Sequence, residues 1–307
     1  MDTDPFDSPR PADSARDNRT PYRDQIHWMS RPVESRTERI HIEVGTDDDG
    51  GFIEISGPKS WRQPLRRQVS LTIGQTSQDP DSVELIASMM SGLLNPPYIA
   101  PPAVTASLKP FHWLLERAKN GLALTQAGYL KPVDVVALSE ILPMARDFPG
   151  KHNREDQTWP VRDFRNMLMH YQLLRRHKDA LVLTPLGRNA VENSSWLWLW
   201  LAWSVIDAEG SSIGRDAVIL NLAFAAGGVN GDQEKISRML TAIGWRANHT
   251  EPIDAFITNE SLSHYDTIIK SIDAEATYFE DQETAPSIVR HFAQLALTMR
   301  AAPAKAR

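Results

Sequence analysis

A seven-residue pattern that occurs twice constrains the fold of this chain more than any other feature. Leu122–Gly128 reads Leu-Ala-Leu-Thr-Gln-Ala-Gly, and Leu181–Gly187 reads Leu-Val-Leu-Thr-Pro-Leu-Gly. In each copy a threonine follows a short apolar stretch, and threonine favours a helix N-cap because its side-chain oxygen accepts a backbone N–H. Pro185 then stands at the first helical position, where a missing N–H is tolerated. Two strand-to-helix junctions with helices between them predict a small winged-helix-like binding module.

The composition allows folded cores and excludes several kinds of chemistry. The 307-residue chain is 41% hydrophobic, carries a formal net charge of −6 and contains no cysteine. The absence of cysteine excludes thiolate catalysis, disulfides and cysteine-ligated zinc, and it is typical of the cytosol. The most apolar run, residues 196–206, is about half the length that spans a bilayer, and the acidic N-terminus lacks the apolar segment of a signal peptide. We therefore expect a cytoplasmic protein that does not insert into membranes.

Local composition divides the chain into four parts. The first is rich in Pro, Asp, Arg and Ser and poor in large apolar groups, so it cannot offset its ordering entropy by burial. This arm is either inert or available to a partner. We predict a disordered arm at 1–37, a small β-containing region at 38–100, the winged-helix-like module at 105–193 and an α-helical region at 194–300.

Alternating segments at 40–44 and 52–55 flank an Asp- and Gly-rich turn at 46–51 and predict a β-hairpin. A third strand is expected at 69–73. The aspartates of the turn also suit calcium, but the spaced ligand set of an EF-hand, which ends in a distal Glu, is absent, and the turn is preferred. Apolar spacing predicts a helix at 81–94, and the proline pairs that follow it predict a stiff linker before the central module.

Within the module, the segment 158–174 shows helical periodicity. Its apolar residues Val161, Phe164, Leu168 and Tyr171 step by three, four and three, which defines an inward face. Arg162, Arg165 and Asn166 are expected on the opposite side. The residues from 173 to 183 predict a compact hairpin with a basic tip, which is the shape of a wing.

The C-terminal region is expected to be a helical bundle. Trp196, Trp200 and Trp203 share one helical face, and Trp198 lies off it. Large aromatic residues at helical spacing fill bundle interiors more often than they form interfaces, so a core position is preferred to a dimer interface. Helices are predicted at 195–206, 213–226, 232–247, 260–273 and 286–300.

The charge is unevenly distributed along the chain. Residues 146–188 carry nine Lys/Arg and five Asp/Glu, whereas residues 189–299 carry six and fifteen. Binding to DNA requires cations that displace phosphate counterions. The same patch could contact a protein or remain solvated. The candidate nucleic-acid-binding residues are Arg162, Arg165, Asn166, Arg175, Arg176, Lys178 and Arg188.

No motif for nucleotide binding, zinc hydrolysis or serine catalysis is present. The nine histidines are scattered, and His170 and His177 are expected as surface or capping residues near the basic face. Glu155 and Asp156 are adjacent acids before a helix, where capping is commoner than a two-metal site. We therefore predict a protein that is not an enzyme, with no cofactor, no catalytic residue and no metal ligand.

Several short sequence motifs of the central region also occur together in one known group of proteins. Leu124–Pro132, Asn153–Val161, Leu173–Arg176 and Leu183–Arg188 follow one another in this order. This set resembles the C-terminal segment of plasmid pRiA4b Orf-3-like and related uncharacterised actinobacterial proteins, over roughly residues 108–205. Only Trp61-Arg62 is weakly similar to a motif of the N-terminal domain of that family. The resemblance implies a recurrent bacterial module and no particular activity.

Together these features predict an α+β chain that is mainly helical. The leading hypothesis is a non-enzymatic DNA-associated or regulatory protein, in which the helix at 158–174 enters a groove of duplex DNA and the hairpin contacts the backbone. The alternative is a protein-interaction scaffold, in which the winged helix and the Trp-bearing helical region bind a partner or a second copy. An enzyme of unrecognised type is the third hypothesis, and no residue in the sequence anchors it.

Overall fold

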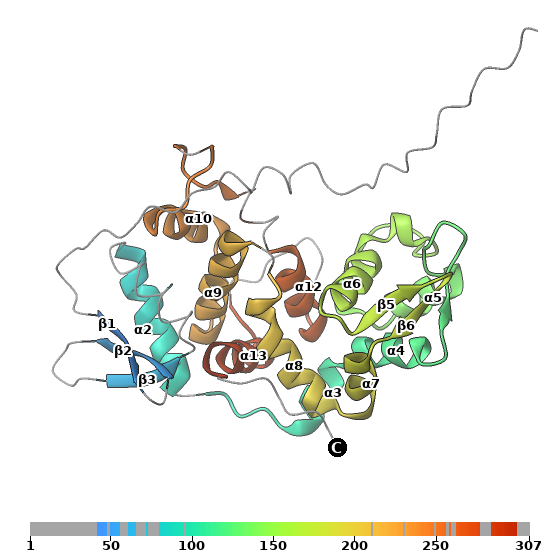
Figure 1. Ribbon diagram of the computed structural model, residues 1–307, viewed down its shortest axis with the longest axis horizontal. Coiled ribbons are helices and arrows are strands. Elements are labelled where there is room, and N and C mark those ends of the chain that lie inside the picture. Colours follow the sequence, from blue (N-terminus) through green and yellow to red (C-terminus); the bar gives the residue numbers. More distant parts are fainter. Residues whose placement is uncertain are drawn as a thin grey trace, which may run out of the picture.

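The computed structural model describes three early strands and most of the chain from residue 80 onwards. The described residues are 42–47, 50–55, 61–65, 72, 80–94, 96–209, 211–229, 231–248, 250–255, 258, 262–276 and 284–299. The predicted arm at 1–37 lies outside them. The fold is mostly helical with two small antiparallel sheets, in agreement with the predicted α+β class (Figure 1). Among the described helices, none combines the length and the apolar character that crossing a membrane requires.

The predicted N-terminal hairpin is confirmed. Strand β1 (Ile42–Asp47) pairs antiparallel with β2 (Gly50–Ile55), and Val44 lies opposite Ile53. Both strands extend further into the acidic turn segment than the alternation of apolar residues indicated. The Asp- and Gly-rich sequence therefore contributes to the strands as well as to the turn.

The third strand of this sheet is not where the sequence pattern placed it. It is β3 (Trp61–Leu65), which pairs with β2 at the edge of the sheet. Thr72, the described residue of the predicted strand 69–73, is helical. Pro64 explains why β3 escaped prediction, because proline lacks the N–H of a ladder hydrogen bond and is tolerated in strands mainly at an edge.

The central part of the chain forms one end of the molecule, on the right in Figure 1. Its sheet has the order β4–β6–β5, so the last strand in sequence lies between the other two. Its elements are α3 (Pro101–Ser107), α4 (Lys109–Ala118), β4 (Leu122–Ala123), α5 (Pro132–Ser139), η2 (Pro143–Ala145), η3 (Glu155–Gln157), α6 (Trp159–His170), β5 (Leu174–His177), β6 (Ala180–Leu183) and α7 (Pro185–Glu192).

Two predicted features of this part are wrong in detail. Pro101 and Pro102 begin helix α3 and are not part of a stiff linker, because the first helical turn has no intrahelical use for their missing N–H groups. Helix α6 ends at His170, four residues before the predicted end. Gln172 then has a left-handed backbone (φ 58°). A residue in this conformation ends a helix, because the chain turns there and the N–H groups that follow donate to the last carbonyl oxygens of the helix.

The two copies of the repeated phrase adopt different structures. Thr184 caps α7 as predicted, since its side-chain oxygen accepts the N–H of Gly187 at 3.0 Å. Thr125 does not cap a helix. Its hydroxyl accepts the N–H of Tyr129 within a turn in which Gly128 has a φ of 83°, and α5 begins only at Pro132. The first copy is therefore a strand followed by a tight turn.

The remaining helices form a bundle around α9, which is buried along most of its length. Helices α2 and α13 pack along α9, and the N-terminal sheet lies beyond α2 (Figure 1). The helix predicted at 81–94 therefore belongs to this bundle. The bundle consists of α2 (Pro80–Leu94), α8 (Ser194–Asp207), α9 (Ser212–Gly227), α10 (Gln233–Ala242), α12 (Ser263–Ile272) and α13 (Ser287–Thr298).

One apolar core runs through the central part and the helical bundle. Phe111 packs edge-on against Phe164 at 5.0 Å between ring centroids, and Trp198 packs likewise against Phe292 at 5.2 Å. Both pairs belong to the same contiguous core. Trp196 is 4% exposed, as predicted for the stripe of tryptophans, whereas Trp200 and Trp203 are half-buried. Trp198, which the spacing placed off that stripe, is 3% exposed and also belongs to the core.

Candidate functional sites

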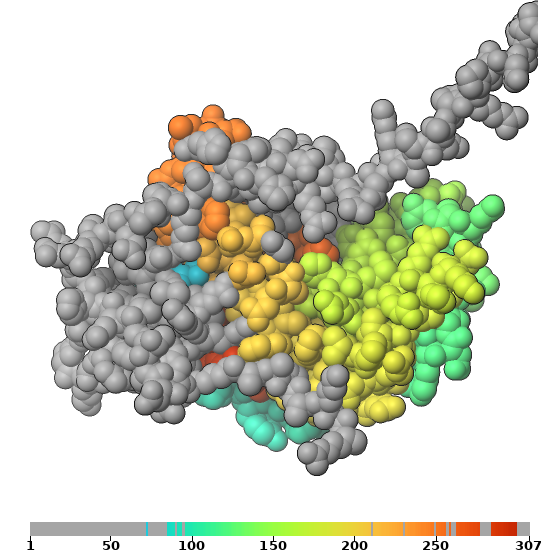
Figure 2. Space-filling view, in the orientation of Figure 1, coloured from blue at the N-terminus to red at the C-terminus, as the bar shows by residue number. Residues whose placement is uncertain are grey.

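The hairpin of β5 and β6 presents a row of basic residues to solvent. Its turn consists of two residues, and Lys178 adopts a left-handed backbone there (φ 52°). Arg175, Arg176 and Lys178 are exposed, while Leu174 is buried. Successive residues of a strand point to opposite faces, so Arg175 and Arg176 cover the two sides of the hairpin. Figure 2 shows this green-to-yellow end of the molecule as a broad open surface.

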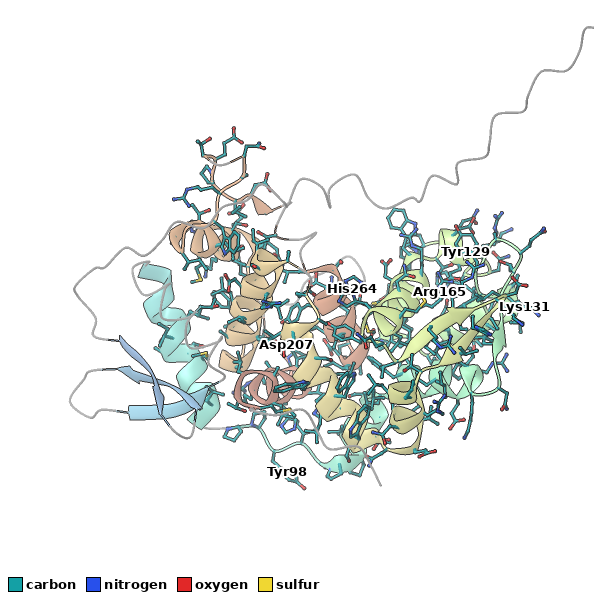
Figure 3. All side chains as sticks on the ribbon, viewed as in Figure 1. Tyr98, Tyr129, Lys131, Arg165, Asp207 and His264 are labelled. Carbon is teal, nitrogen blue, oxygen red and sulfur yellow. The ribbon has the colours of Figure 1, made fainter. Side chains whose placement is uncertain are left out.

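Arg165 does not lie on the outward side of α6, as the periodicity had indicated. Its side chain is buried, and its Nη1 donates to Oε2 of Glu155 and to the carbonyl oxygen of Gly128, both at 3.0 Å (Figure 3). Glu155 is 1% exposed. Arg165 therefore joins α6 to the turn after β4. Its guanidinium group is buried and is not presented to a nucleic acid, contrary to the expectation from the sequence.

Burial dominates the electrostatics of this ion pair. It raises the pKa of Glu155 and lowers the pKa of Arg165, and the attraction between the two charges opposes both shifts. The positive charges of Arg176 and Arg162 lower the pKa of Arg165 further. The guanidinium group of Arg165 is thus close enough to those of Arg162 and Arg176 to be repelled by both.

The turn glycine allows this crowding. A Cβ atom at Gly128 would lie 2.5 Å from Nη1 of Arg176, so a side chain there would displace that guanidinium. Asp163 lies 3.5 Å from Nε of Arg162 and compensates part of the charge. We call Arg162, Arg175, Arg176 and Lys178 the basic hairpin surface.

The other two predicted contact residues lie outside the hairpin. Asn166 on α6 is half-buried, and its Oδ1 accepts from Nη2 of Arg165 at 3.4 Å. Arg188 on α7 is exposed, and its Nη1 donates to the carbonyl oxygen of Leu183 at 3.5 Å. Helix α12 packs along α6, and the exposed residue of α6 is Trp159 at its start, which is 47% exposed.

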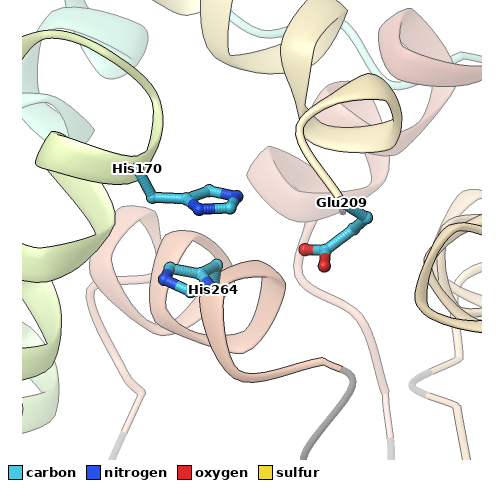
Figure 4. Close-up of side chains that lie close together, drawn as sticks. All are labelled: His170, Glu209 and His264. Atoms are coloured by element: carbon cyan, nitrogen blue, oxygen red, sulfur yellow. The ribbon is translucent and has the colours of Figure 1, made fainter. Parts of the chain in front are cut away.

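A second site brings together residues that are far apart in sequence. His170 is the last residue of α6, Glu209 follows α8, and His264 lies in the first turn of α12 (Figure 4). Their potential ligand atoms all lie within 4.8 Å of one another. The two imidazole rings are stacked, with 3.9 Å between centroids and 15° between planes. From the sequence, His170 was expected as a surface or capping residue, and no metal ligand was predicted.

Glu209 is the buried member of this cluster. It is 8% exposed, and burial raises its pKa to about 7 although the charge of Arg215 lowers it. Its Oε1 has no hydrogen-bond partner among the residues that the structure describes. No spacing in the sequence could reveal this cluster, because its members come from three separate helix ends.

Comparison of the chain with protein families, with curated proteins and with solved structures found no match. The resemblance noted over residues 108–205 therefore remains a prediction, and the site geometry alone carries the functional argument.

Proposed function

We propose that this chain binds duplex DNA through its central part, which acts as a winged helix. The order α4–β4–α5–α6–β5–β6 and the sheet order β4–β6–β5 support this proposal, since they place two helices before a hairpin that projects beside the second of them. In helix-turn-helix proteins the second helix of the pair is the one that meets the groove. Helix α6 occupies that position here.

The observation that carries the proposal is the basic hairpin surface. Arg175, Arg176 and Lys178 are exposed around a two-residue turn, and Arg162 on α6, like Arg176, is close enough to Arg165 to lower its pKa. Cations around a projecting turn neutralise phosphates and release counterions, which supplies most of the affinity for DNA of any sequence. We therefore assign these residues to phosphate contacts. Base contacts fall to the N-terminal end of α6, where Trp159 is exposed.

The proposal is tested by fluorescence anisotropy of the full chain with a random duplex at about 50 and about 200 mM salt. Four phosphate contacts would weaken binding about 100-fold over this range. The triple variant Arg175→Ala/Arg176→Ala/Lys178→Ala should bind more weakly and show a shallower salt dependence. Lys235→Ala, on α10 at the other end of the molecule, is the matched control and should bind as the wild type does.

Absence of binding at low salt would refute the proposal. Binding that the triple variant retains in full, with the same salt dependence, would assign the contacts to another surface.

A protein partner is the second candidate, and one observation favours it. Val133 and Val136 on α5 are 66% and 39% exposed, and Trp159 in the same module is 47% exposed. A contiguous exposed apolar patch marks an interaction surface, and Val133 and Val136 are three positions apart on α5, hence on one side of that helix. The tryptophans of α8 do not add to this surface, because each of them is buried or half-buried.

The two candidates are separated by sedimentation of the wild type and of Val133→Asp/Val136→Asp. A dimer of the wild type that the double variant abolishes, without any binding of DNA by either protein, would favour the scaffold.

A further inference from the structure

The cluster of His170, Glu209 and His264 stands apart from the basic hairpin surface and has its own chemistry. Each of the three side chains projects from the end of a helix, and these helix ends meet where α6 packs against α12. Positions on or beside packed helices hold side chains more reproducibly than free loops do. The three groups are thus held close together by the fold itself.

The donor types suit a particular class of ion. Two imidazole nitrogens and one carboxylate oxygen form the protein ligand set of many sites that keep a fourth position for water. Hard cations such as Mg²⁺ and Ca²⁺ prefer oxygen ligands, whereas imidazole suits zinc and other divalent transition metals. The cluster therefore selects the zinc-like class.

The distances are close to those of a bound site. Donors at about 2.1 Å from one tetrahedral ion are about 3.4 Å apart, and the present atoms lie within 4.8 Å of one another. The rings are nearly parallel, so their in-plane lone pairs lie in separate planes and do not meet at one point. Binding one ion therefore requires an imidazole to rotate about its Cβ–Cγ bond, which is a soft torsion.

Glu209 provides an independent indication. Its residue is more than nine-tenths buried, and Oε1 has no hydrogen-bond partner among the described residues. A buried oxygen without a partner is costly, and a coordinated ion would satisfy it. Arg215 lies near enough to act on Glu209 and compensates its charge. This positive charge reduces the attraction of the site for a cation.

We propose that His170, Glu209 and His264 bind one divalent transition-metal ion of the zinc class, with water as the fourth ligand. This site is independent of the proposed DNA binding. The ion would join the end of α6 to the start of α12 and to the segment between α8 and α9, and its open position could accept an exchangeable ligand.

The test uses the full chain after removal of metal by a chelator. Calorimetric titration with zinc should show one ion per chain, and zinc should raise the midpoint of thermal unfolding because it binds the folded state. His264→Gln and Glu209→Gln should each weaken binding at least tenfold and abolish the thermal shift. His177→Gln is the matched control, since His177 is an exposed histidine of β5 outside the cluster, and it should bind zinc as the wild type does.

Cobalt bound to the wild-type chain gives a second measurement that needs no variant. Three protein donors and one water should produce the intense visible absorption of four-coordinate cobalt. The weak spectrum of six-coordinate cobalt, no stoichiometric zinc binding, or equal zinc binding by all folded variants would overturn the proposal.

Discussion

Gly187 occupies a position in which no side chain fits. A Cβ atom there would lie 2.0 Å from the carbonyl oxygen of Leu173, so α7 and the start of the hairpin could not approach as they do. We expect Gly187→Ala to lower the free energy of unfolding by roughly 1–3 kcal/mol through overpacking. Guanidinium denaturation of the full chain measures this change.

Gly150 is the matched control for that variant. It has a φ of 122°, but a Cβ atom added there would have no neighbour within 4 Å. Gly150→Ala should therefore show only the cost of the backbone conformation, about 1–2 kcal/mol. A Gly187 variant as stable as the wild type would contradict the close approach of α7 to Leu173.

The buried ion pair of Arg165 and Glu155 leads to a second prediction for a single residue. Removing one partner of a buried ion pair leaves a charge without compensation, so Arg165→Met should destabilise the chain by about 3–5 kcal/mol. Glu155→Gln/Arg165→Met removes both charges and should recover a large part of that loss. A double variant less stable than Arg165→Met would contradict this account. Denaturation of the wild type, of Arg165→Met and of the double variant measures these free energies of unfolding.

At the scale of elements, a polar contact joins α4 to the start of α8. The hydroxyl of Ser194 lies 2.8 Å from Nε2 of His112, within hydrogen-bonding distance. Burial lowers the pKa of His112 below 6.5, although the charge of Glu116 opposes the shift. The folded chain therefore takes up this proton less readily than the unfolded chain does.

The consequence is a loss of stability in acid. The contribution of neutral His112 is present in full above the ordinary histidine pKa of about 6.5 and declines as the pH falls below it. We expect denaturation at about pH 7.5 and about pH 5.5 to show a smaller loss for His112→Gln than for the wild type. An equal loss in both proteins would show that other groups carry the acid sensitivity.

Element types were more predictable than element ends. Val161, Phe164, Leu168 and Tyr171 are all buried, as their spacing indicated, because one face of a helix must cover the core. The end of α6 depends on the left-handed Gln172, a residue type with no strong preference for that conformation. Arg165 lies four residues after Val161, so helical spacing places it beside the apolar face. Only its partner Glu155, which comes from another element, makes the burial of its charge possible.

At the scale of the whole molecule, the shared core predicts cooperative unfolding. Phe164 in the central part and Phe292 in the bundle are both 0% exposed and belong to one contiguous cluster. Phe164→Ala and Phe292→Ala should each lower the free energy of unfolding by about 3–5 kcal/mol. Both should shift the same single unfolding transition of the chain. Two transitions, each shifted by one variant only, would indicate two independent folding units.

The candidate sites differed in how far the sequence could reveal them. The basic hairpin surface was predictable, since Arg175, Arg176 and Lys178 are neighbours around one turn. The cluster of His170, Glu209 and His264 was not, because side chains from three separate helix ends meet only after the bundle packs. Local periodicity carries no information on such tertiary contacts.

The stacking of His170 on His264 also bears on the order of folding. The two residues join segments separated by α7, α8, α9 and α10, so their contact forms only after a long loop has closed. Loop closure of this kind precedes the gain from non-local contacts and slows folding. Helix α6 can begin to form from its own local contacts, whereas the two rings meet only when α12 docks on α6. A kinetic probe at this pair would therefore report that docking rather than the formation of the helix itself.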